Sequence, residues 1–226
     1  VWLPILDVSP ELLALGDVVY VPYAVVVYPL VVAGWDVRDA VPWMVMGVGS
    51  AVFVVSTLAW LIARYEQRDV AQTWLYRFSR HPQYLGWIVW SYGLLLFVLR
   101  HSELYQFKIA WSMPSSLPWL IATLIVMGVA MIEEVRMTRV AGARYTAFRD
   151  RTPFLMPLPQ WLSTLIAAPM HAVIRRPWPI NGRQVAVVIG IYAVILIAAS
   201  VPFVVFDWPP RIGWWGFPYN VWPLAG

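Results

Sequence analysis

The sequence contains five apolar runs that are each close to the length needed to cross a lipid bilayer. A helix of about 20 apolar residues spans the roughly 30 Å hydrocarbon core. Only 12% of the residues are charged and 61% are hydrophobic, whereas soluble domains carry about 25% charged residues. Because backbone groups inside a bilayer must be hydrogen-bonded within the protein, we predict an all-α polytopic membrane helix bundle. Its five transmembrane helices are expected at about 12–32, 41–63, 82–99, 117–132 and 184–206.

The segments between and after these runs refine the expected organisation. We expect a single membrane domain over 1–226. Residues 135–150 are polar and are predicted to continue the fourth helix into water. The proline-rich stretch 151–160 should be irregular. Residues 161–176 are moderately apolar with a basic end, which indicates an interfacial or re-entrant helix. The tail 207–226 is rich in tryptophan and proline and should lie on the membrane surface.

The distribution of arginine predicts the orientation. The net charge is +4, and the excess is concentrated in 64–80 and 135–183. These two regions are separated by an even number of predicted spans, so they share a side. Basic loops favour the cytoplasm, which makes the chain a multi-pass protein with both regions facing the cytoplasm. The charge is attributed to topology and not to nucleic acid. No signal peptide is assigned.

The sequence also restricts the chemistry. It contains no cysteine, which excludes disulfides, thiolate metal ligands and cysteine nucleophiles. Its three histidines are dispersed, so no metal site is predicted. His101 and His171 are assigned no functional role.

The stretch Arg80-His81-Pro82-Gln83-Tyr84-Leu85-Gly86 is the first candidate site. Pro82 suits the first turn of a helix, so Arg80 and His81 would lie at the N-terminal end of the third span. That end carries free N–H groups and the positive pole of the helix dipole, which favour an anion. Tyr84 follows His81 by three positions and shares its face, while Gly86 permits close approach of a partner or ligand.

The pair Glu133-Glu134 is the second candidate site. It lies at the C-terminal end of the fourth span, where the helix dipole disfavours carboxylates. Salt bridges to Arg136 or Arg77 would explain the pair without a ligand, and topology alone would explain Arg80. A zwitterionic ligand would fit equally well, with its carboxylate towards Arg80 and its amine or hydroxyl groups towards the glutamates.

The segment from Tyr76 to Gly86 resembles the RHPxYxG signature of integral membrane methyltransferases, which include isoprenylcysteine carboxyl methyltransferases and phospholipid N-methyltransferases. The second half of the signature is similar as well. It comprises the double glutamate followed by Gly142, Tyr145, Arg151-Thr152-Pro153-Phe154 and Pro157. The resemblance covers about 45–157, a methyltransferase-like core. Residues 158–226 add the interfacial segment, an extra span and the aromatic tail.

This resemblance implies a cytoplasm-facing site for S-adenosylmethionine and a lipophilic acceptor that enters from the membrane lipids. The matched cofactor-binding positions are Arg80, His81, Tyr84, Gly86, Glu133, Glu134, Tyr145 and Arg151. An amine acceptor would lose a proton to Glu133, Glu134 or His81, which are the candidate catalytic residues. The chain departs from the signature at Trp74, where glycine is common, and at Phe148, where tyrosine is common.

Several alternatives stay open at this point. The acceptor would be a lipid amine, a prenylcysteine carboxylate, or a related isoprenoid or thiol. Membrane sterol or isoprenoid reductases that use NADPH share part of this region, although the double glutamate is not typical of them. A non-catalytic subunit of a membrane complex is a third reading, in which 184–226 would contact a partner subunit.

Overall fold

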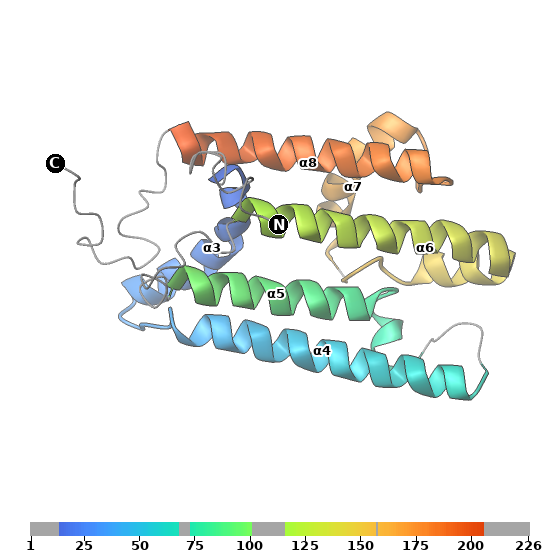
Figure 1. The fold of residues 1–226 in the computed structure, drawn as a ribbon, viewed down its shortest axis with the longest axis horizontal. Coiled ribbons are helices and arrows are strands. Elements are labelled where there is room, and N and C mark those ends of the chain that lie inside the picture. Colours follow the sequence, from blue (N-terminus) through green and yellow to red (C-terminus); the bar gives the residue numbers. More distant parts are fainter. Residues whose placement is uncertain (1–13, 68–72, 101–115, 157, 206–226) are drawn as a thin grey trace, which may run out of the picture. The chain divides into compact units, whose positions relative to one another are not determined.

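The computed structural model describes residues 14–67, 73–100, 116–156 and 158–205. Within these ranges every regular element is a helix (Figure 1). The predicted surface tail at 207–226 lies outside the described residues. In chain order the elements are the 3₁₀ helix η1 (Ala14–Tyr20), α3 (Val21–Val32), α4 (Ala40–Tyr65), the 3₁₀ helix η2 (Trp74–Arg77), α5 (Pro82–Arg100), α6 (Ser116–Arg151), α7 (Gln160–Ile174) and α8 (Gly182–Val205).

Five segments are long and apolar enough to cross a membrane, which confirms the predicted all-α bundle. They are Leu15–Val32, Ala40–Tyr65, Pro82–Leu99, Ser116–Arg151 and Gly182–Pro202. Only 17% of the most apolar window of α4 is buried within the protein, and its exposed side chains include Trp43, Phe53 and Trp60. Large exposed apolar surface of this kind suits lipid rather than water.

The remaining elements follow the sequence pattern closely. The polar segment after the fourth apolar run is helical and begins within α6, as predicted, but the backbone at Gly142 is non-helical and interrupts it. Residues 152–156 are irregular, as the prolines predict, and α7 is the helix expected at about 161–176. Its interfacial or re-entrant position in a membrane stays a prediction.

The chain forms two compact units. The described residues of the first are 14–46, 91–100, 116–122 and 195–205, and its core contains Tyr20, Tyr23, Val27, Leu95 and Leu96. Ser116 Oγ donates to the Asp17 carboxylate at 2.5 Å, and Tyr92 Oη donates to the Val19 carbonyl at 2.8 Å. Polar contacts of this type hold helices together where the hydrophobic effect between them is weak.

The second unit, with described residues 47–67, 73–90, 123–156 and 158–194, contains all the candidate site residues. In this unit α4 packs directly on α5. A Cβ atom at Gly49 would lie 2.2 Å from the Trp90 nitrogen, and one at Gly86 would lie 2.5 Å from the Phe53 nitrogen. A cluster of Met131, Val135, Met170, Val185 and Val188 joins α6, α7 and α8.

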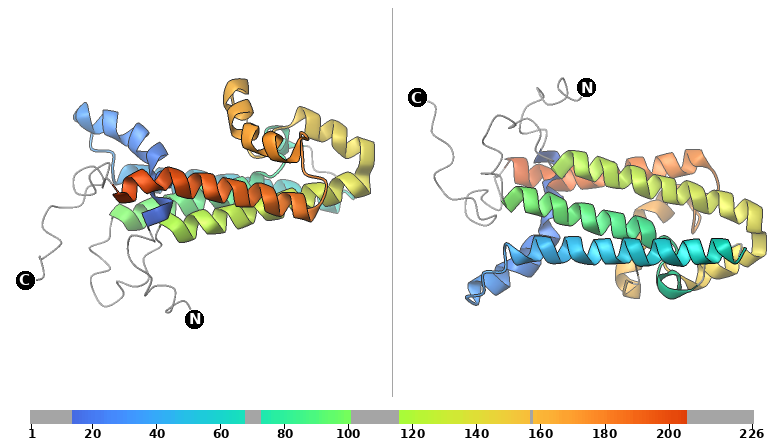
Figure 2. Two further views of the ribbon diagram at one scale, coloured as in Figure 1. Left: turned by 90° about the horizontal axis from the view of Figure 1, so that it is seen from above. Right: turned by 60° about the horizontal axis from the view of Figure 1, so that its bottom comes forward.

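Gly142 divides α6 into two parts. Its backbone angles are φ 51° and ψ −128°, close to the first central position of a type II′ turn, which glycine dominates. Figure 2 shows the segment after this residue turning sharply away from the direction of the first part. The turn positions the second part of α6 for the site described next.

Candidate functional site

The two sequence motifs are joined by a backbone hydrogen bond. The Arg80 N–H donates to the Pro153 carbonyl at 3.0 Å, and the His81 N–H donates to Ser79 Oγ at 3.2 Å. Helix α5 begins at Pro82, as predicted. These bonds fix Arg80 and His81 immediately before the helix and against the irregular segment that follows α6.

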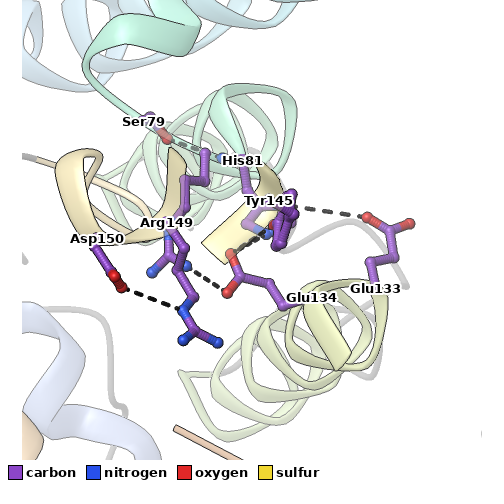
Figure 3. Close-up of polar contacts among 8 residues, drawn as sticks. Ser79, His81, Glu133, Glu134, Tyr145, Arg149 and Asp150 are labelled. Atoms are coloured by element: carbon purple, nitrogen blue, oxygen red, sulfur yellow. Dashed lines mark hydrogen bonds and ion pairs between the residues drawn. The ribbon is translucent and has the colours of Figure 1, made fainter. Parts of the chain in front are cut away.

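Glu134 is the centre of a buried polar cluster. Its side chain is 0% exposed. Arg80 Nη1 donates to one carboxylate oxygen. The other oxygen lies 3.1 Å from His81 Nε2 and accepts a hydrogen bond of 3.2 Å from Tyr145 Oη. Figure 3 shows His81 and Tyr145 directed towards this carboxylate. A buried carboxylate is tolerated when its charge is paired and its oxygens are hydrogen-bonded.

The Arg80 guanidinium is enclosed by aromatic rings. Its Cζ lies 5.0 Å from the Trp178 ring centroid and 5.6 Å from that of Phe154, within the range of cation–π attraction. Burial lowers the pKa of Arg80, and the Glu134 carboxylate acts in the opposite direction. Arginine nevertheless stays protonated because its ordinary pKa exceeds 12.

Two donors in this enclosure lack an acceptor. Arg80 Nε and Trp178 Nε1 are both buried, and neither has a hydrogen-bond partner among the described residues. An unpaired buried donor costs free energy. This part of the cluster would therefore favour a further acceptor oxygen.

Glu133 forms the exposed side of the site. Its side chain is 50% exposed, and its carboxylate accepts a hydrogen bond of 2.7 Å from Tyr84 Oη. His81 Nδ1 lies 3.9 Å from the same carboxylate, so the two ring nitrogens of His81 face the two glutamates. Burial, followed by the charge of Glu133, raises the pKa of Tyr76 to about 12, which keeps that phenol neutral near pH 7.

The structure thus brings together six of the eight residues that the sequence predicts for the cofactor site. They are Arg80, His81, Tyr84, Glu133, Glu134 and Tyr145. Gly86 instead makes the close contact with Phe53 on α4. Arg151 is exposed at the end of α6 and takes no part in the contacts around Glu134 that the structure describes.

Two neighbours of the cluster are absent from the sequence prediction. Arg149 lies beside Arg80 and electrostatically opposes its positive charge, and its Nε is 3.8 Å from Asp150 Oδ1 (Figure 3). Trp178 lies between α7 and α8, outside the motif region. No spacing rule points to either residue, because both positions depend on the path of the chain after Gly142.

The charges of Arg80 and the two glutamates are arranged differently from the prediction. The sequence treats Arg80 and the acidic pair as two separate poles for one ligand. In the structure Glu134 pairs with Arg80, so the exposed negative charge of the site is that of Glu133.

Residues 18–152 match the model of a family described as proteins of unknown function (DUF1295). No curated protein and no solved structure matches the chain. The family match spans all of α4, α5 and α6, and includes the Arg80–Gly86 stretch and the second motif from Glu133 to Thr152. Because it covers more than half of the 226 residues, the chain belongs to the DUF1295 family.

Proposed function

We propose that this protein is an integral membrane methyltransferase that uses S-adenosylmethionine to methylate a lipophilic acceptor. The observation that carries the proposal is the convergence of Arg80, His81 and Tyr84 on Glu133 and Glu134. These residues come from the start of α5, including the two residues before it, and from α6, and they belong to the two halves of the methyltransferase-like signature. The proposed site faces the cytoplasm, as the basic flanking segments favour.

The side chains present fit a zwitterionic cofactor with hydroxyl groups. The half-exposed Glu133 carboxylate is suited to accept hydrogen bonds from an amine or from ribose hydroxyls. The unpaired Nε–H of Arg80 and Nε1–H of Trp178 are suited to donate to a carboxylate. Phe154, whose ring centroid lies 5.1 Å from that of His81, provides an aromatic face of the kind that attracts a cation.

When bound, S-adenosylmethionine supplies an electrophilic methyl group. The chain contributes mainly orientation and exclusion of water, since methyl transfer needs close alignment and little charge stabilisation. Glu134 holds Arg80, His81 and Tyr145 in one arrangement. Glu133 is the exposed base, and His81 links it to Glu134. An amine acceptor would lose its proton to Glu133, whereas a carboxylate or thiolate acceptor needs no base.

Transfer of a labelled methyl group tests the activity. Purified full-length protein in lipid nanodiscs is incubated with methyl-labelled S-adenosylmethionine and a total membrane lipid extract, and the lipid fraction is analysed by mass spectrometry. We expect label in one lipophilic product with the unmodified chain and little with Glu133→Gln. The matched control is Arg136→Gln, a change of one exposed side chain on the same helix. Label that is absent from every product would refute the activity, and equal label in Glu133→Gln would refute the role assigned to Glu133.

A further inference from the structure

The short helix η2 separates two different environments. Tyr76 is buried and interacts electrostatically with Glu133. Trp74, Arg77 and Phe78 are exposed and line a pocket of about 460 Å³. Its other lining residues are Val55 of α4, Thr73 and Leu75. Among the described residues none of these six forms a hydrogen bond or ion pair with Glu133 or Glu134, and this Arg77 pocket is distinct from the site described above.

The backbone conformation at Trp74 indicates that the tryptophan side chain has a role beyond the fold of η2. Its φ is 54°, in the left-handed region that bulky residues rarely adopt and that glycine adopts freely. The local conformation therefore favours glycine, yet the position carries the largest side chain. That side chain is 57% exposed, so packing within the described residues does not account for it. The indole is instead available to whatever occupies the pocket.

The lining combines one cation with apolar surface. Among the described residues Arg77 makes no hydrogen bond or ion pair, and a guanidinium binds phosphate oxygens in a bidentate manner. Trp74 and Phe78, 57% and 59% exposed, offer faces suited to a hydrocarbon chain. A soluble phosphate would satisfy Arg77 but leave these faces in water.

The position of η2 in the chain favours the same ligand. It lies between Tyr65, the end of α4, and Pro82, the start of α5, and both helices are candidate spans. Such a segment falls near the boundary between hydrocarbon and water, where tryptophan is enriched and phospholipid headgroups lie. A lone arginine also favours an anionic headgroup over a zwitterionic one, because it repels the cationic part of the latter.

We propose that the Arg77 pocket binds an anionic phospholipid, with the phosphate on Arg77 and an acyl chain against Trp74, Phe78 and Val55. This inference does not rest on methyl transfer. The pocket shares η2 with Tyr76, so the bound lipid would lie on the exposed side of this helix, while Tyr76 is buried.

Native mass spectrometry of the full chain in detergent tests the inference without any cofactor. The protein is titrated with phosphatidylglycerol and with phosphatidylcholine of identical acyl chains. We expect tighter binding of phosphatidylglycerol, and a loss of about tenfold in Arg77→Gln, the effect of removing one charge-assisted contact. Arg136→Gln removes an exposed arginine elsewhere and should leave the affinity unchanged.

A second variant separates binding from folding. Trp74→Gly suits the positive φ and removes the indole, so its thermal stability in lipid-free detergent should equal or exceed that of the parent while its phosphatidylglycerol affinity falls. Equal binding of the two lipids, an equal loss in Arg136→Gln, or full affinity in both pocket variants would overturn the proposal. Competition by glycerol 3-phosphate as effective as that by the lipid would overturn the lipid assignment.

Discussion

Arg80 and Glu134 form an ion pair across 54 positions of sequence, with 6% of the arginine side chain and none of the glutamate side chain exposed. Removing one partner of a buried pair leaves the other charge uncompensated, at a cost of about 3–5 kcal/mol. We therefore expect Glu134→Ala and Arg80→Ala each to lower the free energy of unfolding by about that amount. Thermal and denaturant unfolding in detergent measure the change.

The double variant Arg80→Met with Glu134→Leu provides the control. Replacing both partners with apolar residues removes the buried charges together, and such replacements are often close to neutral. The double variant should be more stable than either single alanine variant. A double variant as unstable as the sum of the single losses would show that the pair is not the energetic unit we describe.

Gly86 should be intolerant of any side chain. A Cβ atom there would lie 2.5 Å from the Phe53 nitrogen and 2.8 Å from the Phe53 Cα, both backbone atoms that cannot move without shifting α4. Overpacking of this kind typically costs about 1–3 kcal/mol. Gly86→Ala should therefore unfold at a lower temperature than the parent. Gly47→Ala, in open space on α4, is the matched control and should be neutral or stabilising, and equal effects of the two changes would contradict the proposed packing.

Gly142 tests the role of the bend in α6. Its φ of 51° and ψ of −128° strain any other residue, so Gly142→Ala should destabilise the protein by about 1–3 kcal/mol. The same change should weaken the Tyr145 contact with Glu134, because Tyr145 lies beyond the bend. Alanine at Gly128, whose nearest neighbour would be the Ile189 side chain at 3.4 Å, is the comparison. Unfolding temperature and hydrogen exchange of α6 are the measurements, and a fully stable Gly142→Ala would exclude a required bend.

The predicted orientation in the membrane can be tested by cysteine labelling. The chain contains no cysteine, so only an introduced cysteine would react. A single cysteine is introduced at Arg176 or at Trp35, both exposed, and intact cells are treated with a membrane-impermeant maleimide. If the basic segments face the cytoplasm, Trp35→Cys is labelled in intact cells and Arg176→Cys only after permeabilisation. The reverse pattern would invert the topology.

Much of the fold follows from sequence because each span is a local property. Apolar length sets the five candidate helices, and Pro82 marks the start of α5 because its ring suits a first helical turn. The glutamate pair and the Arg80-His81 stretch could be expected to meet, since neighbouring helix ends place them close together. These features depend on a few adjacent residues and not on the path of the whole chain.

The details of the site depend on backbone angles that a sequence does not specify. Gly142 could equally continue a helix or bend it, and the bend decides that Arg149, and not Arg151, lies beside Arg80. Trp178 reaches Arg80 from beyond the motif region. Predicting that Arg80 pairs with Glu134 also requires knowing that both side chains are buried. Only a buried charge is costly to leave unpaired.

The central claim is that Arg80–Tyr84 and Glu133–Glu134 form an S-adenosylmethionine site, and calorimetric titration with S-adenosylhomocysteine tests it most directly. Full-length protein in nanodiscs should bind one equivalent, and NADPH should not bind. Glu133→Gln keeps an acceptor for Tyr84 but removes the exposed charge, so it should fold normally and bind about tenfold or more weakly. Arg136→Gln should bind like the parent. Absence of S-adenosylhomocysteine binding by folded protein, or binding of NADPH in its place, would contradict the account.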